Sequence, residues 1–217
     1  MKLLLFHRTQ IKGFTLLELL MSISIMGIMT VIFFVRYPET VKRLTLANLT
    51  HSAAFIVHEA QVRGSAVDSV NSSVGGYGVY VDLASPNKII LFGDLVDGTM
   101  SPYQIYVGDG LYDSSPTDEA KTTTNLPYGY TIAKLCVGSG FPFSCNTENN
   151  PAITSLTFSF TRPSPQPHIY VNNVVGSETI SAGCMEFHSL LAPLPGHVRS
   201  IQVFSSGIIR TINTGCE

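Results

Sequence analysis

The sequence has few charged residues and no excess of basic ones. Charged side chains make up 13% of its 217 residues, and 13 Lys and Arg stand against 15 Asp and Glu, for a formal net charge of -2. No dense Lys/Arg cluster occurs beyond the first twelve positions, so a nucleic-acid partner is not expected. The hydrophobic content of 45% indicates a folded chain, and its length favours one globular domain with an appendage.

Common catalytic and metal-binding motifs are absent as well. The sequence contains no G-x-S-x-G, no P-loop and no H-E-x-x-H, so we expect neither an enzyme nor a cofactor. His58 and Glu59 form an H-E pair, but Val62 stands where a zinc-binding helix needs its second His, which favours ordinary helix-surface residues. No two of the four cysteines are two to four residues apart, which argues against a zinc site.

A long apolar run from Phe14 to Val35 contains a single charged residue, Glu18. As a helix this run would be about 33 Å long, enough to cross a bilayer. Basic residues at positions 2, 8 and 12 precede it, which predicts a cytoplasmic N-terminus and export of everything after Val35. Bulky and charged residues follow the run, where an ordinary signal peptide has small ones. We therefore expect an uncleaved single-pass segment with a costly carboxylate near its start.

The start of this run resembles a known processing site. In the stretch KGFTLLELL, Gly13 precedes Phe14, and Glu18 is the fifth residue after the glycine. This pattern is similar to the leader-cleavage and methylation site of type IV pilins and type II secretion pseudopilins. The resemblance implies that a prepilin peptidase cuts between Gly13 and Phe14 on the cytoplasmic side and N-methylates the new Phe14 amine. The apolar helix survives this cut.

A role for Glu18 in filament assembly follows from this resemblance. Unpaired in an apolar helix bundle, the Phe14 amine and the Glu18 carboxylate each carry an electrostatic cost, part of which is recovered when the amine of one subunit meets Glu18 of a neighbour. Such a pair selects one register among similar packings. The implied function is a structural subunit, stored in the inner membrane and assembled with other pilin or pseudopilin subunits and a membrane assembly platform into an extracellular or periplasmic filament.

Two sequence details bear on the kind of subunit. Val35 stands where major pilins usually carry proline, which favours a minor pilin or a pseudopilin, and Pro38 predicts a kink where the chain leaves the membrane.

The alternative function is a filament-tip adhesin or a DNA-uptake module on the same anchor. Removing the three leader cations leaves 10 basic against 15 acidic residues, a formal charge of -5, which argues against DNA binding.

The residues after the apolar run predict an amphipathic helix over residues 36–64. Apolar residues recur there every three or four positions, so this helix should continue the first, pack its apolar stripe on a sheet and stop at Gly64. The stripe comprises Val41, Leu44, Leu46, Leu49, Ala53, Ile56, Val57 and Ala60.

Residues 65–217 read as an exported antiparallel β domain, with short apolar runs between turn residues. Two hairpins are expected, one around residues 84–87 and one with Gly207 in its turn, and residues 109–126 read as a polar, mobile loop.

The fold class is therefore α+β: a long N-terminal helix, 14–35 and 36–64, packed on an antiparallel sheet after a leader at 1–13. This plan resembles the H-type minor pseudopilins and the related T-type minor pilins. Candidate strands cover residues 77–83, 88–95, 104–107, 130–137, 153–161, 168–171, 184–188, 199–204 and 208–212.

Four cysteines in the exported part predict two disulfides. Three pairings are possible, and we favour Cys136 with Cys145, closing a short loop, and Cys184 with Cys216, tying down the C-terminus. Each bond would be worth roughly 2 to 4 kcal/mol.

Four acids lie beside glycine-rich turns and could offer oxygen ligands to calcium. Their spacing matches no EF-hand loop, so solvated turns are the favoured interpretation and no metal site is expected. These acids are Asp94, Asp97, Asp109 and Asp113.

Overall fold

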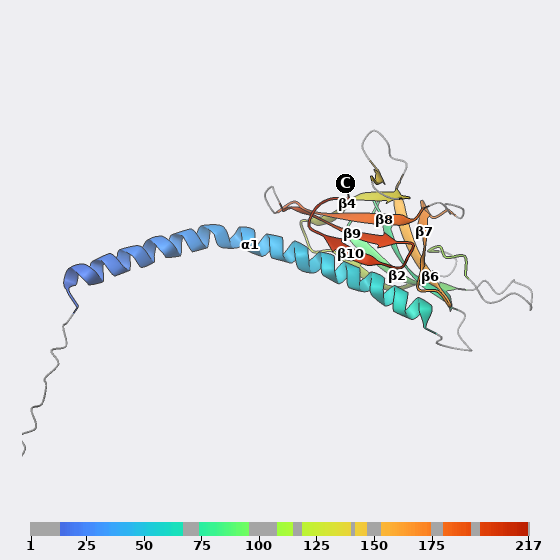
Figure 1. The fold of residues 1–217 in the computed structure, drawn as a ribbon, viewed down its shortest axis with the longest axis horizontal. Helices are drawn as coiled ribbons and strands as arrows, with labels where there is room; N and C mark the ends of the chain where they lie inside the picture. The colour runs from blue at the N-terminus through green and yellow to red at the C-terminus, as the bar shows by residue number, and fades with distance from the viewer. Residues whose placement is uncertain are drawn as a thin grey trace, which may run out of the picture. The chain divides into compact units, whose positions relative to one another are not determined.

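The computed structural model describes residues 14–66, 74–95, 108–114, 119–139, 142–146, 153–174, 180–191 and 196–216. The chain forms two units, Met1–Val41 and Lys42–Glu217. The first contains the N-terminal part of a single helix, α1 (Leu16–Ser65), and the second contains the rest of α1 and the ten strands of the described residues (Figure 1).

Helix α1 is one continuous element that includes Pro38, and the kink predicted at this proline stays a prediction. The expected stop at Gly64 is wrong by one residue, since α1 ends at Ser65 and Gly64 lies buried inside the last turn. A Cβ on Gly64 would clash with the backbone oxygen of Phe160. Glycine is therefore needed here because the helix approaches a strand closely, not because the helix must end.

The C-terminal part of α1 buries a narrower face than its sequence pattern predicted. Val41 and Leu44 are exposed, although both belong to the predicted stripe. Thr50 is buried instead, and its Oγ1 donates a hydrogen bond to the Leu46 carbonyl at 2.8 Å, which removes the cost of burying a hydroxyl. The buried face consists of Leu46, Leu49, Thr50, Ala53, Ala54, Val57, Ala60 and Gly64.

Two five-stranded sheets complete the second unit, and every strand pair in them is antiparallel. The first has the order β3-β2-β1-β6-β7 and the second the order β10-β9-β8-β4-β5. The strands of the first sheet are β1 (Val74–Asp82), β2 (Lys88–Leu95), β3 (Ala120–Asn125), β6 (Ser155–Thr161) and β7 (Pro167–Val171). Those of the second are β4 (Tyr130–Gly138), β5 (Ser144–Cys145), β8 (Ala182–Ser189), β9 (Val198–Phe204) and β10 (Ile209–Ile212).

One hydrophobic core joins the two sheets and the buried face of α1. The sheets meet closely where the Phe158 ring of β6 covers Gly183 of β8, because a Cβ on Gly183 would lie 2.6 Å from that ring. Both expected hairpins are present, β1–β2 and β9–β10, and Gly207 in the second turn has the positive φ, 86°, that its sequence predicted. The predicted α+β fold, a long helix on an antiparallel domain, is confirmed.

Two strands, β3 and β5, were not predicted from the sequence. The predicted mobile loop at residues 109–126 contains β3, which pairs with β2 as an edge strand. Its polar residues gave no apolar alternation because most of β3 is exposed. The two-residue β5 was also missed, whereas the candidate strand at 104–107 lies outside the described residues.

Candidate functional site

The first turn of α1 holds the acid on which the sequence interpretation rests. Glu18 is exposed, and its backbone N–H donates to Thr15 Oγ1 at 3.2 Å. Thr15 is thus the N-cap, and the sequence T-L-L-E forms a capping-box pattern with Glu18 at its third helical position. A carboxylate there also opposes the positive end of the helix macrodipole. Phe14 is exposed just before the cap, and Gly13 lies outside the described residues.

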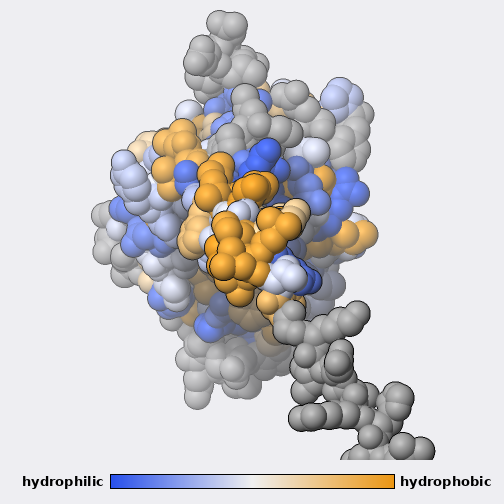
Figure 2. Space-filling view, turned by 90° about the vertical axis from the view of Figure 1, so that its left-hand side faces the viewer, coloured by the Kyte–Doolittle hydropathy of each residue, from blue (hydrophilic) through white to orange (hydrophobic). Residues whose placement is uncertain are grey.

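The helix that follows this cap exposes apolar side chains on every side. Its large hydrophobic residues from Phe14 to Val35 are 55–78% exposed, and none of its most apolar 18-residue window is buried within the chain. Orange, apolar residues gather at the centre of the surface in Figure 2, with blue and white residues around them. By length and composition α1 is the one helix among the described residues able to cross a membrane.

Three hydroxyl residues within this apolar stretch form hydrogen bonds with the helix itself. The hydroxyls of Ser22, Ser24 and Thr30 each donate to the backbone carbonyl four residues earlier, at 2.7, 2.9 and 2.7 Å. No hydroxyl among these three needs water or a partner helix. The segment is therefore suited to lipid or to a bundle of apolar helices, where unsatisfied polar groups are costly.

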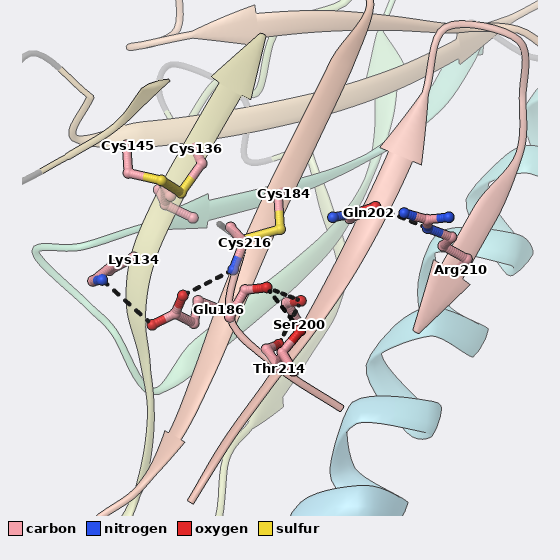
Figure 3. Close-up of a disulfide and its surroundings, with 12 residues drawn as sticks. Lys134, Cys136, Cys145, Cys184, Glu186, Ser200, Gln202, Arg210, Thr214 and Cys216 are labelled. Carbon is pink, nitrogen blue, oxygen red and sulfur yellow. Dashed lines mark hydrogen bonds and ion pairs between the residues drawn. A yellow bond between two sulfur atoms is a disulfide. The ribbon is translucent and has the colours of Figure 1, made fainter. Parts of the chain in front are cut away.

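Two disulfides stabilise the second sheet. Cys136 on β4 bonds Cys145 on β5, and Cys184 on β8 bonds Cys216 near the C-terminus (Figure 3). These are the two pairs favoured from the sequence. The first joins neighbouring strands of one sheet, and the second holds the C-terminal segment against β8.

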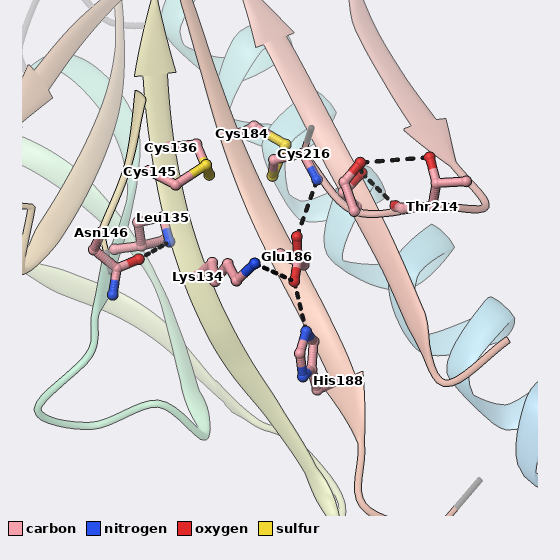
Figure 4. Close-up of polar contacts among 12 residues, drawn as sticks. Lys134, Leu135, Cys136, Cys145, Asn146, Cys184, Glu186, His188, Thr214 and Cys216 are labelled. Atoms are coloured by element: carbon pink, nitrogen blue, oxygen red, sulfur yellow. Dashed lines mark hydrogen bonds and ion pairs between the residues drawn. A yellow bond between two sulfur atoms is a disulfide. The ribbon is translucent and has the colours of Figure 1, made fainter. Parts of the chain in front are cut away.

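A buried carboxylate reinforces this attachment of the C-terminus. Glu186 on β8 accepts a hydrogen bond from the Cys216 backbone N–H at 3.0 Å, and its other oxygen lies 2.6 Å from His188 Nε2 and 3.9 Å from Lys134 Nζ (Figure 4). Burial alone would raise the pKa of Glu186, but the hydrogen bonds from His188 and Cys216, with the Lys134 charge, lower it below its usual value. Ser200 Oγ adds a hydrogen bond to the Thr214 carbonyl at 2.9 Å. This cluster has a structural role in anchoring the chain end.

The interpretation of the four turn acids as solvated is wrong for Asp94. Asp94 lies in β2 and is fully buried, and its Oδ2 accepts the Gly110 N–H at 2.9 Å. Burial, with the nearby charges of Asp109, Glu119 and Asp113 as smaller contributions, raises its pKa to about 7. No group of three or more His, Cys, Asp or Glu suited to a metal occurs among the described residues, and Asp97 lies outside them.

The remaining candidate pair has ordinary helix-surface contacts. His58 Nδ1 lies 3.2 Å from Gln61 Oε1, and Glu59 forms a 2.6 Å ion pair with Arg63. Neither contact suggests catalysis.

A comparison with known protein families matches the segment that contains the first turn of α1. Residues 8–34 match the family described as the prokaryotic N-terminal methylation motif. No curated protein and no solved structure matches the chain. The motif supports a type IV pilin-like subunit with a membrane-anchoring helix, and the α+β fold is consistent with that class.

Two features of these sites were missed from the sequence. The Thr15 cap had a readable signal, a Thr three residues before a Glu at the start of an apolar run. The Glu186 cluster had none, because its members come from β4, β8 and the C-terminal segment, which only the fold brings together.

Proposed function

We propose that this chain is a minor pilin or pseudopilin, a structural subunit of a type IV pilus-like filament or a type II secretion pseudopilus. A prepilin peptidase removes the leader between Gly13 and Phe14 and methylates the Phe14 amine. The subunit is stored in the cytoplasmic membrane with residues 14–35 spanning the bilayer and the β domain exported, and an assembly platform then moves it into the filament. The observation that carries the proposal is an apolar helix left uncovered by its own chain, with an acid in its first turn.

In this proposal Glu18 has two separable roles. As the third helical residue it belongs to the capping box and favours the helix start by about 1 kcal/mol or less. As a charge it pairs with the methylated amine of a neighbouring subunit once both are removed from water, which fixes the register of the helices. The capping-box hydrogen bond does not require a negative charge, whereas pairing with the amine does.

The substitution Glu18→Gln separates the two roles, since Gln also serves at this position of a capping box. Expressed with the cognate assembly machinery, Glu18→Gln should insert into the membrane normally and be lost from purified filaments. Glu59→Gln, which removes a helix-surface acid from the same helix, is the matched control. Filaments that contain Glu18→Gln at the wild-type level would refute the charge-pairing role.

Processing is tested on the native protein by mass spectrometry of its N-terminus. The expected product begins with methylated Phe14, and Gly13→Ala should accumulate as the uncleaved precursor. Filament subunits that retain Met1 would contradict the proposal.

A further inference from the structure

We propose that the end of the β domain at which α1 enters it is a membrane-contact surface, the proximal rim, that rests in the headgroup region of the bilayer while the subunit is stored. The rim consists of Tyr128, Leu190 and Leu191 together with Lys42 and Arg43. The inference rests on the proposed membrane storage of the subunit and adds a second lipid contact to it.

Two loops form this rim around the first helical residues of the second unit. Tyr130 at the start of β4 donates from its hydroxyl to the Lys42 carbonyl at 3.3 Å, which places the β3–β4 loop beside the helix. On the β8–β9 loop, a Cβ on Gly196 would lie 3.4 Å from Arg43 Nη1. The Leu190 N–H donates to the Gly129 carbonyl at 2.8 Å, so the two loops are joined to each other.

These loops expose large apolar side chains that the core of the β domain does not bury. Tyr128 is 93% exposed and Leu190 is 76% exposed. Leu191 lies over Gly129, where a Cβ would be 2.6 Å from its side chain, and it stays partly exposed. A tyrosine and two leucines on adjoining loops, next to two cations, have the composition of a surface that enters a lipid interface.

Chain length brings a bilayer within reach of this rim. Only residues 36–41 separate the end of the apolar run at Val35 from Lys42, and as helix they span about 9 Å. The headgroup region on each side of the hydrocarbon core is itself several ångströms thick. The positive charges of Lys42 and Arg43 favour contact with anionic headgroups near the surface.

The opposite end of the domain provides an internal control. Gln61 lies 19 residues after Lys42, about 28 Å further along α1, and its Nε2 donates to the Gly207 carbonyl at 2.9 Å. The next residue, Ile208, is 59% exposed. Like the rim residues it is an exposed apolar residue between two strands, but it lies near the C-terminal end of α1.

The absence of tryptophan from the sequence makes the test direct. Full-length single-Trp variants would be reconstituted in vesicles of phosphatidylethanolamine and phosphatidylglycerol whose acyl chains are brominated near the headgroup. Tyr128→Trp and Leu190→Trp should show blue-shifted emission and greater quenching than Ile208→Trp. If the two rim probes are quenched no more than the Ile208→Trp probe, the inference is overturned.

A fourth variant, Phe34→Trp, distinguishes failure of the rim from failure of the proposed function. Strong quenching of this probe with an unquenched rim would mean that the helix is inserted but the rim does not touch lipid. An unquenched Phe34→Trp probe would remove the membrane anchor itself and both proposals with it. A rim probe that shifts only as the protein-to-lipid ratio rises, without bromine quenching, would assign the rim to a second copy of the chain and overturn the lipid contact.

Lipid charge gives the final check. Replacing phosphatidylglycerol with phosphatidylcholine should weaken quenching at positions 128 and 190 and leave Phe34→Trp unchanged. Equal rim quenching in both lipids would refute the part assigned to Lys42 and Arg43.

Discussion

The two parts of helix α1 obey different packing rules within one continuous element. From residue 46 to residue 64 its buried residues recur on one face, and that face packs into the core of the β domain. From Leu16 to Val35 it is apolar on every side, and its large side chains remain exposed. An amphipathic helix completes its packing within its own chain, whereas a uniformly apolar helix takes its partner from outside. The boundary between the parts is therefore the point beyond which the helix is no longer covered by its own chain.

Truncating a buried aromatic should give the largest contrast between the two parts. Phe158→Ala removes a fully buried ring that covers Gly183 and should lower the free energy of unfolding of the domain by about 3–5 kcal/mol. Phe34→Ala removes an exposed ring from the apolar part and should leave domain stability unchanged. Urea unfolding of the full chain in detergent, followed by tyrosine near-UV circular dichroism, measures both. An equal loss in Phe34→Ala would show that the apolar part also contributes to the domain.

Removing the two disulfides should rank by loop length. Cys184 and Cys216 are 32 residues apart and Cys136 and Cys145 are 9 apart, so chain entropy predicts losses of about 3.5 and about 2.5 kcal/mol. Double alanine variants, unfolded in urea under non-reducing conditions, test this order. Neither pair should change the helicity of the apolar part in micelles. The reverse order would mean that strain or residual structure in the unfolded chain outweighs loop closure.

Two glycines of α1 provide a smaller, closely matched contrast. Gly64→Ala forces a Cβ against the Phe160 backbone, which cannot move as a side chain can, and should cost about 2 kcal/mol. Gly27→Ala meets no atom within 4 Å and should leave domain unfolding unchanged while favouring helix by up to about 1 kcal/mol. The urea midpoints of the two variants are the measurement. A stable Gly64→Ala domain would mean that β6 and the helix can separate at little cost.

The same contrast explains how much the sequence could predict. Features that local sequence determines could be predicted: the long apolar run, the Gly13–Glu18 pattern, the Gly207 turn and the α+β class. Residues decided by tertiary contact were not. Gly64 looked like a helix stop because its partner, the backbone of Phe160, is about a hundred residues away in the chain.

Exposure also limited the prediction of strands and polar groups. An edge strand such as β3 needs no apolar alternation, since most of its side chains face solvent. Asp94 looked like a turn acid because its burial depends on the segment around Gly108 and Gly110, which packs over it. Sequence periodicity reports which side of an element is covered, and it fails where the covering segment is irregular.

One acid in each unit of the chain, Glu18 in Met1–Val41 and Asp94 in Lys42–Glu217, extends the comparison to pH. Glu18 is exposed and, in the proposed function, awaits a cation, whereas Asp94 is buried among other acids. Burial raises the pKa of Asp94 from 3.8 to about 7, so the folded chain binds this proton more tightly than the unfolded chain does. Its contribution to stability is then fully present below pH 3.8 and is lost as the pH rises through about 7.

The variant Asp94→Asn should therefore flatten the fall in domain stability between pH 5 and 8, a difference of about 2–3 kcal/mol. Some slope should remain, since burial also raises the pKa of Glu119. Asp82→Asn, which removes a carboxylate that caps the β1–β2 turn through the Ala84 N–H, is the control and should keep the full slope. Urea unfolding across this pH range gives the result. If the slope survives in Asp94→Asn and disappears in Asp82→Asn, Asp94 is not the group that titrates. A buried carboxylate must destabilise the domain at the pH where it ionises, so removing it must remove that loss of stability.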